Sequence, residues 1–317
     1  MNRQTLGYIA FTAFLLAVPM LGIYPVFAMK IMCYALFACA FNLLLGFTGL
    51  LSFGHAAFLG AAAYASGHAM KVWGLSTEVG ILYGVAVAGI LGLVMGLLAI
   101  RRSGIYFAMI TMALAQMVFF FFLQAKFTGG EDGLQGVPRG TLFGLIDLKS
   151  DTNLYYVIMA LFIFGYFLIW RTVHSPFGQV LKAIRENEAR TISLGYDVEK
   201  FKLLAFVLSA MLAGLAGSMK VLAFQLATLT DVSWTTSGEA LLVSIVGGLN
   251  TMLGPVVGSI IMGSMEHYLA GFAEWVLIIQ GAVFVLVVML FRKGLVGQMQ
   301  HLLPWATRAG KTGKEAT

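Results

Sequence analysis

The sequence has few charged residues, few prolines and almost no cysteine. Asp, Glu, Lys and Arg make up 11% of its 317 residues, whereas a soluble domain carries about a quarter. The only two cysteines, Cys33 and Cys39, lie in one apolar stretch, and their spacing turns them to different sides of a helix. This spacing excludes a disulfide between them, and no zinc-binding pattern is present. The low charge excludes an ordinary soluble domain and predicts a membrane protein.

Sequence motifs of common enzymes are also absent. Residues 310–312, Gly-Lys-Thr, lack the upstream glycine loop of an ATP-binding site. Ser52 and His55 do not lie in a G-x-S-x-G pattern, and Glu266 and His267 do not form H-E-x-x-H. The sequence therefore predicts neither an enzyme nor a metal or cofactor site. Nucleic-acid binding is disfavoured despite a net charge of +6, because Lys and Arg form short clusters beside apolar spans.

Long apolar stretches dominate instead, since hydrophobic residues make up 60% of the chain. A helix needs about 20 apolar residues to cross a bilayer core. Clear candidates are residues 6–23, 26–46, 79–100, 104–125, 154–171, 201–225 and 274–291. A signal-peptide cleavage site at 26–28 is an alternative, but the many later spans favour a retained first helix. We therefore predict an all-α, polytopic inner-membrane helical bundle over 1–294, followed by a disordered tail at 295–317.

Two regions, 47–72 and 237–271, are apolar but interrupted by glycine. In the second, Gly248, Asn250, Gly254 and Pro255 together form what is called the Gly-Asn-Gly-Pro break. The helices left there, 56–70 and 237–249, measure about 22 and 20 Å, less than the ~30 Å of a bilayer core. Irregular backbone at this depth is tolerated where it lines a cavity, and paired breaks indicate a pathway in transporters. Close helix packing through small residues explains the same glycines equally well.

Polar residues inside the spans add to this prediction. A buried polar group in hydrocarbon needs a partner, so such residues are expected to face the bundle or a cavity rather than lipid. His55, which follows a glycine, has an equally good explanation as a residue that starts a helix. The candidate residues of the pathway or of the broken helices are Asn42, Gly49, Ser52, Gly54, His55, Gln116, Gly247, Gly248, Asn250, Gly254 and Pro255.

The positions of Lys and Arg predict the orientation. Residues 101–102, the basic cluster at 171–202 and the basic C-terminal tail should face the cytoplasm. Counting 56–72 as one span and dividing 237–271 into two satisfies this rule with about ten helices, within a range of about eight to ten. Both termini are then cytoplasmic, and residues 126–153 form a periplasmic loop. Charged residues near the outer ends of spans are expected to reach the interface: Lys30, Lys220, Glu239, Glu266 and Glu274.

The basic cluster also predicts an amphipathic helix from Phe177 to Leu194, which Gly195 ends. Its charges are mixed, with two glutamates among its arginines, and two of its apolar residues, Ala183 and Ala189, are small. A helix lying on lipid would show a basic face and large apolar anchors. The pattern therefore favours docking into a cytoplasmic partner, and binding to the lipid surface stays the alternative.

The stretch SPFGQVLKAIRENEARTISLGYDVEKFKLLAF at 175–206 closely resembles the cytoplasmic loop of M-type permease subunits in bacterial branched-chain amino-acid ABC importers. Further matches follow in order: FNLLLGFTGLLSFGHAAFLG at 41–60, GIYFAMITMALAQMVFFF at 104–121, TGGEDGL at 128–134, VGGLNTMLGPVVGS at 246–259 and FRKGLVG at 291–297. The general importer pattern, Glu-Ala-Ala and then Gly three residues later, is loosely met. Here Glu188-Ala189-Arg190 reaches Gly195 one residue late.

The resemblance implies a permease subunit of an ATP-driven importer that moves branched-chain or related amino acids from the periplasm to the cytoplasm. Besides the lipid bilayer, it implies cytoplasmic ATPase subunits, a second homologous permease subunit and a periplasmic substrate-binding protein as partners. ATP hydrolysis is then expected in the separate ATPase, which contacts the coupling loop, residues 172–200. The residues expected at this contact are Phe177, Val180, Arg185, Glu186, Glu188, Ala189, Arg190, Leu194 and Gly195.

Two points stay open. A secondary transporter or channel for a small polar solute is the alternative function, although no spaced pair of buried acids predicts an ion-coupled carrier. The loop at 126–153 is either a plain solvated connector or, as the resemblance implies, part of the mouth where a binding protein docks.

Overall fold

The computed structural model describes residues 24–144, 146–269, 271, 275–291 and 294–302, together with Leu16 and Pro19. Its helices are α2 (Pro25–Thr48), α3 (His55–Lys71), α4 (Thr77–Ala99), α5 (Ile105–Gln124), α6 (Asp151–Val173), α7 (Pro176–Glu186), α8 (Glu188–Ser193), α9 (Val198–Phe224), α10 (Trp234–Gly247), α11 (Gly254–Leu269), α12 (Val276–Leu290) and α13 (Gly294–Leu302). The strands are β1 (Leu134–Gln135), β2 (Thr141–Leu142), β3 (Ile146–Asp147) and β4 (Leu226–Ala227), and the 3-10 helices are η2 (Lys126–Thr128), η3 (Gly130–Asp132) and η4 (Leu229–Val232).

Parts of two predictions fall on residues outside this description. The first span, 6–23, lies there apart from Leu16 and Pro19, and so does the tail from 303 onward. Over 295–302, where the sequence analysis expects a disordered tail, the chain is helical as part of α13.

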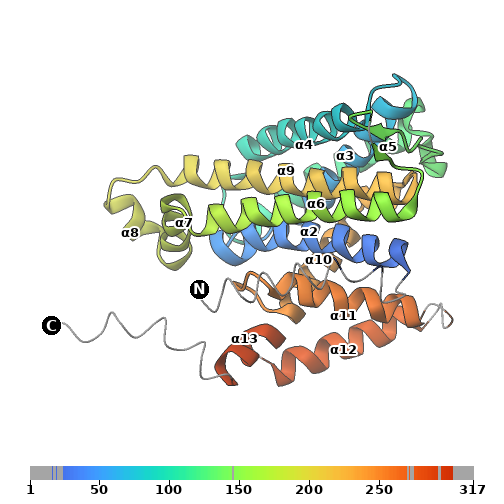
Figure 1. The fold of residues 1–317 in the computed structure, drawn as a ribbon. Coiled ribbons are helices and arrows are strands. Elements are labelled where there is room, and N and C mark those ends of the chain that lie inside the picture. The colour runs from blue at the N-terminus through green and yellow to red at the C-terminus, as the bar shows by residue number, and fades with distance from the viewer. Residues whose placement is uncertain are drawn as a thin grey trace.

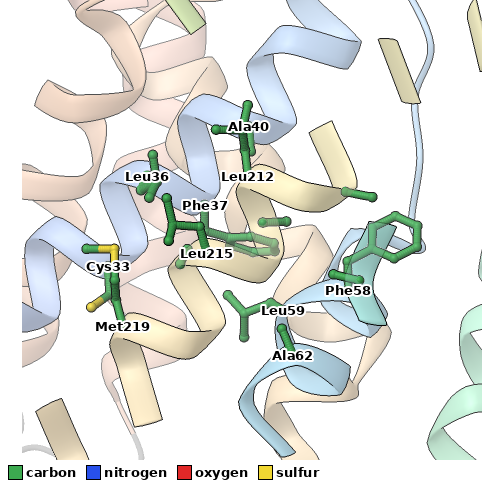
Figure 2. Packing of buried hydrophobic residues seen from close by; sticks show 14 of the residues in the cluster. Cys33, Leu36, Phe37, Ala40, Phe58, Leu59, Ala62, Leu212, Leu215 and Met219 are labelled. Atoms are coloured by element: carbon green, nitrogen blue, oxygen red, sulfur yellow. The ribbon is translucent and has the colours of Figure 1, made fainter. Parts of the chain in front are cut away.

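Helix α9 lies at the centre of the bundle and packs against α2, α3 and α4 (Figure 1). Figure 2 shows apolar side chains of α2 and α3, among them Phe37 and Leu59, packed against Leu215 of α9, and all three are buried. Small residues bring the helices close: a Cβ atom added to Gly217 of α9 would overlap the Leu59 carbonyl. Lipid supplies no hydrophobic force between helices, so this close packing stabilises the bundle.

Six apolar stretches are long enough to cross a membrane, judged by length and composition. They are α2, α4, α5, α6, α9 and Ile278–Gln298, which includes most of α12. Helices α3, α10 and α11 have 17, 14 and 16 residues, about 21–26 Å at 1.5 Å per residue. The expected helical bundle with interrupted segments is confirmed, while the count of about ten spans stays a prediction. Residues 46–55, where α2 ends and α3 begins, and residues 247–255, where α10 ends and α11 begins, are called the glycine breaks below.

The bundle has two different ends (Figure 1). At one end α7 and α8 connect α6 to α9, and at the other end residues 126–150 connect α5 to α6. This second connection packs onto the bundle, because β1 pairs antiparallel with β4 just after α9, and β2 pairs with β3. Thr128 is buried there, with its hydroxyl 2.6 Å from the carbonyl oxygens of Phe122 and Ala125. The connection is therefore anchored to the end of the bundle by a few buried residues, while most of its described residues are exposed.

Candidate functional site

Helix α7 begins where the sequence supplies both a cap and a suitable proline. Ser175 Oγ accepts a hydrogen bond from the Gly178 N–H at 3.3 Å. Pro176 occupies the first turn, where its missing N–H has no intrahelical partner to lose. Leu181 and Ile184 are buried against the bundle, while most of the opposite face is exposed. The predicted amphipathic helix is thus confirmed over α7.

The expectation of one continuous helix from Phe177 to Leu194 is wrong. The helix ends at Glu186, and Asn187 is extended, with φ −159° and ψ 100°. The Asn187 Oδ1 accepts a hydrogen bond from the Arg190 N–H at 3.0 Å and so caps a second short helix, α8. Asparagine favours caps over helix interiors because its side chain binds nearby backbone groups. The loop is therefore a pair of helices with a bend between them.

The two helices present an open apolar surface at the end of the bundle. Three large residues of the coupling loop are solvent-exposed: Ile192 at 56%, Leu194 at 69% and Tyr196 at 45%. A groove of about 680 Å³ includes Tyr196 and is also lined by His174, Ser175, Pro176, Phe177, Gln179, Val180 and Phe201. Phe177 and Phe201 stack in this groove with ring centroids 5.5 Å apart. Exposed apolar residues gathered beside a groove are typical of a protein contact surface.

The charged residues in and just after the coupling loop differ in their partners. Lys202, near the start of α9, is buried, and its Nζ donates to Glu188 Oε1 at 2.6 Å. Glu188 was expected to contact an ATPase, but here it has a partner within its own chain. Glu186, Ala189 and Arg190 are exposed, as a contact with another protein requires.

Arg185 reaches from α7 into the bundle. Its Nη1 donates to the carbonyl oxygen of Gly46, in the last turn of α2, and to Oδ1 of Asn250, between α10 and α11. The side-chain stem passes close to Gly49, where an added Cβ atom would lie 2.8 Å from Arg185 Cγ. Arg185 was expected among the residues that contact an ATPase. In the structure its guanidinium instead binds the two glycine breaks.

The two glycine breaks also lie close together, because a Cβ atom added to Gly46 would lie 3.1 Å from the Asn250 nitrogen. Asn42, one turn before Gly46 in α2, binds the second break: its Nδ2 donates to the Thr251 carbonyl at 3.0 Å, and its Oδ1 accepts from the Asn250 N–H at 3.4 Å. The φ angles of Gly49, Gly248 and Asn250 are 80°, 121° and 66°. Glycine adopts positive φ at little cost, and asparagine tolerates the left-handed region better than most residues. Four predicted residues are thus brought together at one place beside α7.

Glycines hold α10 and α11 in direct backbone contact. A Cβ atom added to Gly247 would overlap the Gly254 carbonyl, and one added to Gly258 would overlap the carbonyl of Val243. Pro255 is the second residue of α11, again a position where its missing N–H is tolerated. Of the two explanations left open for these glycines, close packing therefore applies to α10 and α11.

Three other candidates lie apart from Arg185. Ser52 Oγ accepts a hydrogen bond from the Gly54 N–H at 3.2 Å and shapes the turn before α3. His55 starts α3, is fully buried among phenylalanine rings, and its Nε2 lies 2.7 Å from Ser209 Oγ. Because Ser209 donates its one O–H to a backbone carbonyl of α2 at 2.5 Å, Nε2 is the donor to Ser209. Gln116 is half-buried on α5 and makes no side-chain hydrogen bond with the described residues.

Two residues of this arrangement were not predicted. Lys202 counted only toward the orientation, although a buried lysine at the end of a span requires a partner, and that requirement is readable in a sequence. Thr251 contributes its backbone carbonyl, which no side-chain pattern reveals. Within the described ranges, no three His, Cys, Asp or Glu side chains lie close enough to hold a metal ion.

Residues 25–288 match the sequence pattern of a family described as "Branched-chain amino acid transport system / permease component". The chain is 26% identical over 308 residues to the "High-affinity branched-chain amino acid transport system permease protein LivM" of Escherichia coli (strain K12). This match covers 90% of this chain and 72% of that protein. It is 31% identical over 144 residues, 43% of this chain and 42% of the other, to the "Probable branched-chain amino acid transport permease protein LivH" of Methanocaldococcus jannaschii. An "L-arabinose ABC transporter permease protein AraH" of Azospirillum brasilense is 30% identical over 199 residues, 60% of this chain and 56% of the other. No solved structure matches the chain.

Proposed function

This chain belongs to the family of permease components of branched-chain amino acid transport systems, and from that premise we propose that it is the membrane subunit of an ATP-driven importer. It moves branched-chain or related amino acids from the periplasm to the cytoplasm across the inner membrane of a bacterium. Cytoplasmic ATPase subunits bind the coupling loop, a second homologous permease completes the pathway, and a periplasmic binding protein delivers the substrate. The likeness over most of the chain to the branched-chain amino acid permease LivM of Escherichia coli supports this substrate class.

The main support for this proposal is that the Arg185 side chain makes two contacts with the bundle. The residue lies on a loop that extends from the bundle, yet its guanidinium binds Gly46 and Asn250, which belong to different glycine breaks. A displacement of α7 therefore changes contacts at both breaks together. An ATPase that binds the loop differently with and without ATP would favour one arrangement of the breaks over the other.

The surface of the coupling loop favours a protein partner over lipid. Its exposed residues include acidic Glu186 and Glu199 as well as basic Arg190. An anionic lipid surface attracts basic residues and repels acidic ones, so mixed charge weakens binding to lipid. The groove beside Tyr196 supplies a concave apolar contact that a flat bilayer surface would not fill.

Reconstitution tests the proposal. We expect proteoliposomes that contain this chain, a second permease and a cognate ATPase to take up L-leucine only when ATP and the binding protein are present. Ala189→Trp, on exposed α8, should reduce co-purification of the ATPase, because added bulk disturbs the contact. Ala113→Trp, at an exposed position of α5, is the matched control and should leave both assembly and uptake unchanged. Uptake driven by an ion gradient without the ATPase would instead identify a secondary transporter.

A topology measurement tests the orientation. Thiol reagents that cannot cross the membrane should label Lys149→Cys from the periplasmic side and Glu199→Cys from the cytoplasmic side only. The native Cys33 and Cys39 are buried, so they give little background. The predicted cytoplasmic position of Arg292, which lies outside the described residues, is checked with Arg292→Cys. Labelling of this last variant from outside would contradict the ten-span topology and leave the transporter assignment standing.

A further inference from the structure

A second feature of the molecule lies far from the coupling loop. A cavity of about 560 Å³ opens among α2, η4, α10, α11 and α12, near the end of α9 opposite the coupling loop. Charged residues line it, namely Lys30, Asp231, Glu239 and Glu266. From the sequence, Lys30, Glu239 and Glu266 were expected near outer span ends, each reaching the membrane interface individually. In the structure they share one cavity.

The charges in and behind this cavity do not balance. Lys30 Nζ pairs with Glu266 Oε1 at 2.7 Å, and Lys220, behind the cavity wall, pairs with buried Asp231. Glu239 has no ion-pair partner among the described residues. The two lysines, Lys30 and Lys220, therefore neutralise two of the three carboxylates. The carboxylate of Glu239 is left without a neutralising partner among the described residues. The excess of one negative charge favours a ligand that brings a positive group.

The hydrogen bonds that remain available point the same way. The Thr236 hydroxyl donates to the Thr230 carbonyl and that of Ser259 donates to the Pro255 carbonyl, so both oxygens have only acceptor capacity left. Together with the Glu239 carboxylate, they offer acceptors to a group with several N–H donors.

Lys30 supplies the opposite capacity. An ammonium has three N–H donors, and one of them serves Glu266, so two remain for a ligand carboxylate. The walls between the charged groups are apolar and include Ile31, Leu242 and Met262. The cavity thus combines an acceptor for an ammonium, a donor for a carboxylate and an apolar wall.

We propose that this outer cavity binds the transported solute as an α-amino acid zwitterion, with the ammonium at Glu239, the carboxylate at Lys30 and an aliphatic side chain on the apolar wall. This site rests on the proposed function and adds to it a location in the permease where the solute is recognised after delivery. It lies apart from the glycine breaks, for which the sequence left a pathway and close helix packing equally open.

Protection of an engineered thiol tests the site without relying on transport. Leu242→Cys places a thiol on the cavity wall, and the buried native cysteines give little background. Met262→Cys, on another wall, serves as a second reporter if the first variant folds poorly. The assembled complex, in phosphatidylcholine vesicles without binding protein, is labelled with a small water-soluble thiol reagent. L-leucine is the probe, and its analogues 3-methylbutylamine and 4-methylpentanoate lack the carboxylate and the ammonium, respectively.

We expect L-leucine to slow labelling and 4-methylpentanoate to have no effect. Glu239→Gln should raise the L-leucine concentration for half-protection by about tenfold or more, because the ammonium loses a charged acceptor. Glu78→Gln, the same change on α4 outside the cavity, should leave that concentration unchanged. Adding phosphatidylethanolamine to the vesicles should not protect the thiol, since a lipid headgroup also carries an ammonium and would otherwise be the occupant.

The outcomes separate this site from the proposed function. If L-leucine fails to protect either reporter, or protects Glu239→Gln as well as the parent, the site is wrong even where ATP-driven uptake is normal. Protection by 4-methylpentanoate equal to that by L-leucine also overturns it. Protection that persists in a complex without ATP-driven uptake would support the site and contradict the importer mechanism.

Discussion

Replacing Arg185 by glutamate is expected to lower ATP-driven uptake by about tenfold or more while the ATPase stays bound to the permease. The change places a carboxylate where the guanidinium donates to the Gly46 carbonyl and to Asn250 Oδ1, so two favourable contacts become repulsive. A hydrogen bond from a charged group contributes about 1.5–3 kcal/mol, and the exposure of Arg185 favours the lower value. Even one such contact corresponds to about a tenfold change in an equilibrium.

The measurement pairs uptake with the ATPase activity of the same proteoliposomes. We expect the ATPase to hydrolyse ATP without moving solute, because exposed Ile192 and Leu194, which belong to the proposed docking surface, are untouched. Arg185→Lys keeps the charge but not the planar geometry, and should restore uptake in part. Arg102→Glu reverses a charge at an exposed position outside the coupling loop and serves as the matched control. Normal uptake by Arg185→Glu would show that the contact with the glycine breaks does not transmit the effect of ATP.

The second large effect is expected at Gly254. A Cβ atom there would overlap the Gly248 carbonyl and Thr251 Oγ1. Overpacking in a dense core costs about 1–3 kcal/mol, and a clash with backbone is harder to relieve than one with a flexible side chain. Gly254→Val should therefore separate α10 from α11 and lower the amount of folded protein in the membrane several-fold.

A graded series makes this prediction specific. At Gly54 an added Cβ atom would lie 2.9 Å from the Thr111 carbonyl and 2.9 Å from the flexible end of Met95, so Gly54→Val should have a smaller effect. At Gly281 of α12 nothing lies within 4 Å, and Gly281→Val should be tolerated. Membrane abundance and thermal stability in detergent rank the three variants. Equal abundance of all three would remove the packing explanation for the second break.

The positions of the interrupted helices could be predicted because glycine and proline act locally. The Gly-Asn-Gly-Pro break ends α10 and precedes α11 as expected. The bend at Asn187 was missed because asparagine is allowed within a helix, and only the cap geometry shows that its side chain ends one helix and starts another. Local patterns thus locate a glycine break more reliably than they locate a capped bend.

Contacts between distant residues were beyond the sequence. Arg185 meets a residue 139 positions earlier and another 65 positions later, and a single chain without related sequences gives no sign of such pairings. His55 shows the intermediate case. Its burial followed from a polar residue in an apolar stretch, but its partner Ser209 lies 154 positions away on α9. A polar residue in an apolar stretch can be predicted to need a hydrogen-bond partner, but only the fold shows which residue that partner is.

The arrangement of α9 has a mechanical consequence. This helix has 27 residues, about 40 Å in length at 1.5 Å per residue. Lys202 ties its first turns to α8, and Lys220 ties its last turns to Asp231 beside the outer cavity. Because the helix is continuous, we expect a tilt at α8 to displace its far end as well. In the proposed topology, the ion pair at Lys220 then links the outer cavity to the coupling loop on the other side of the membrane.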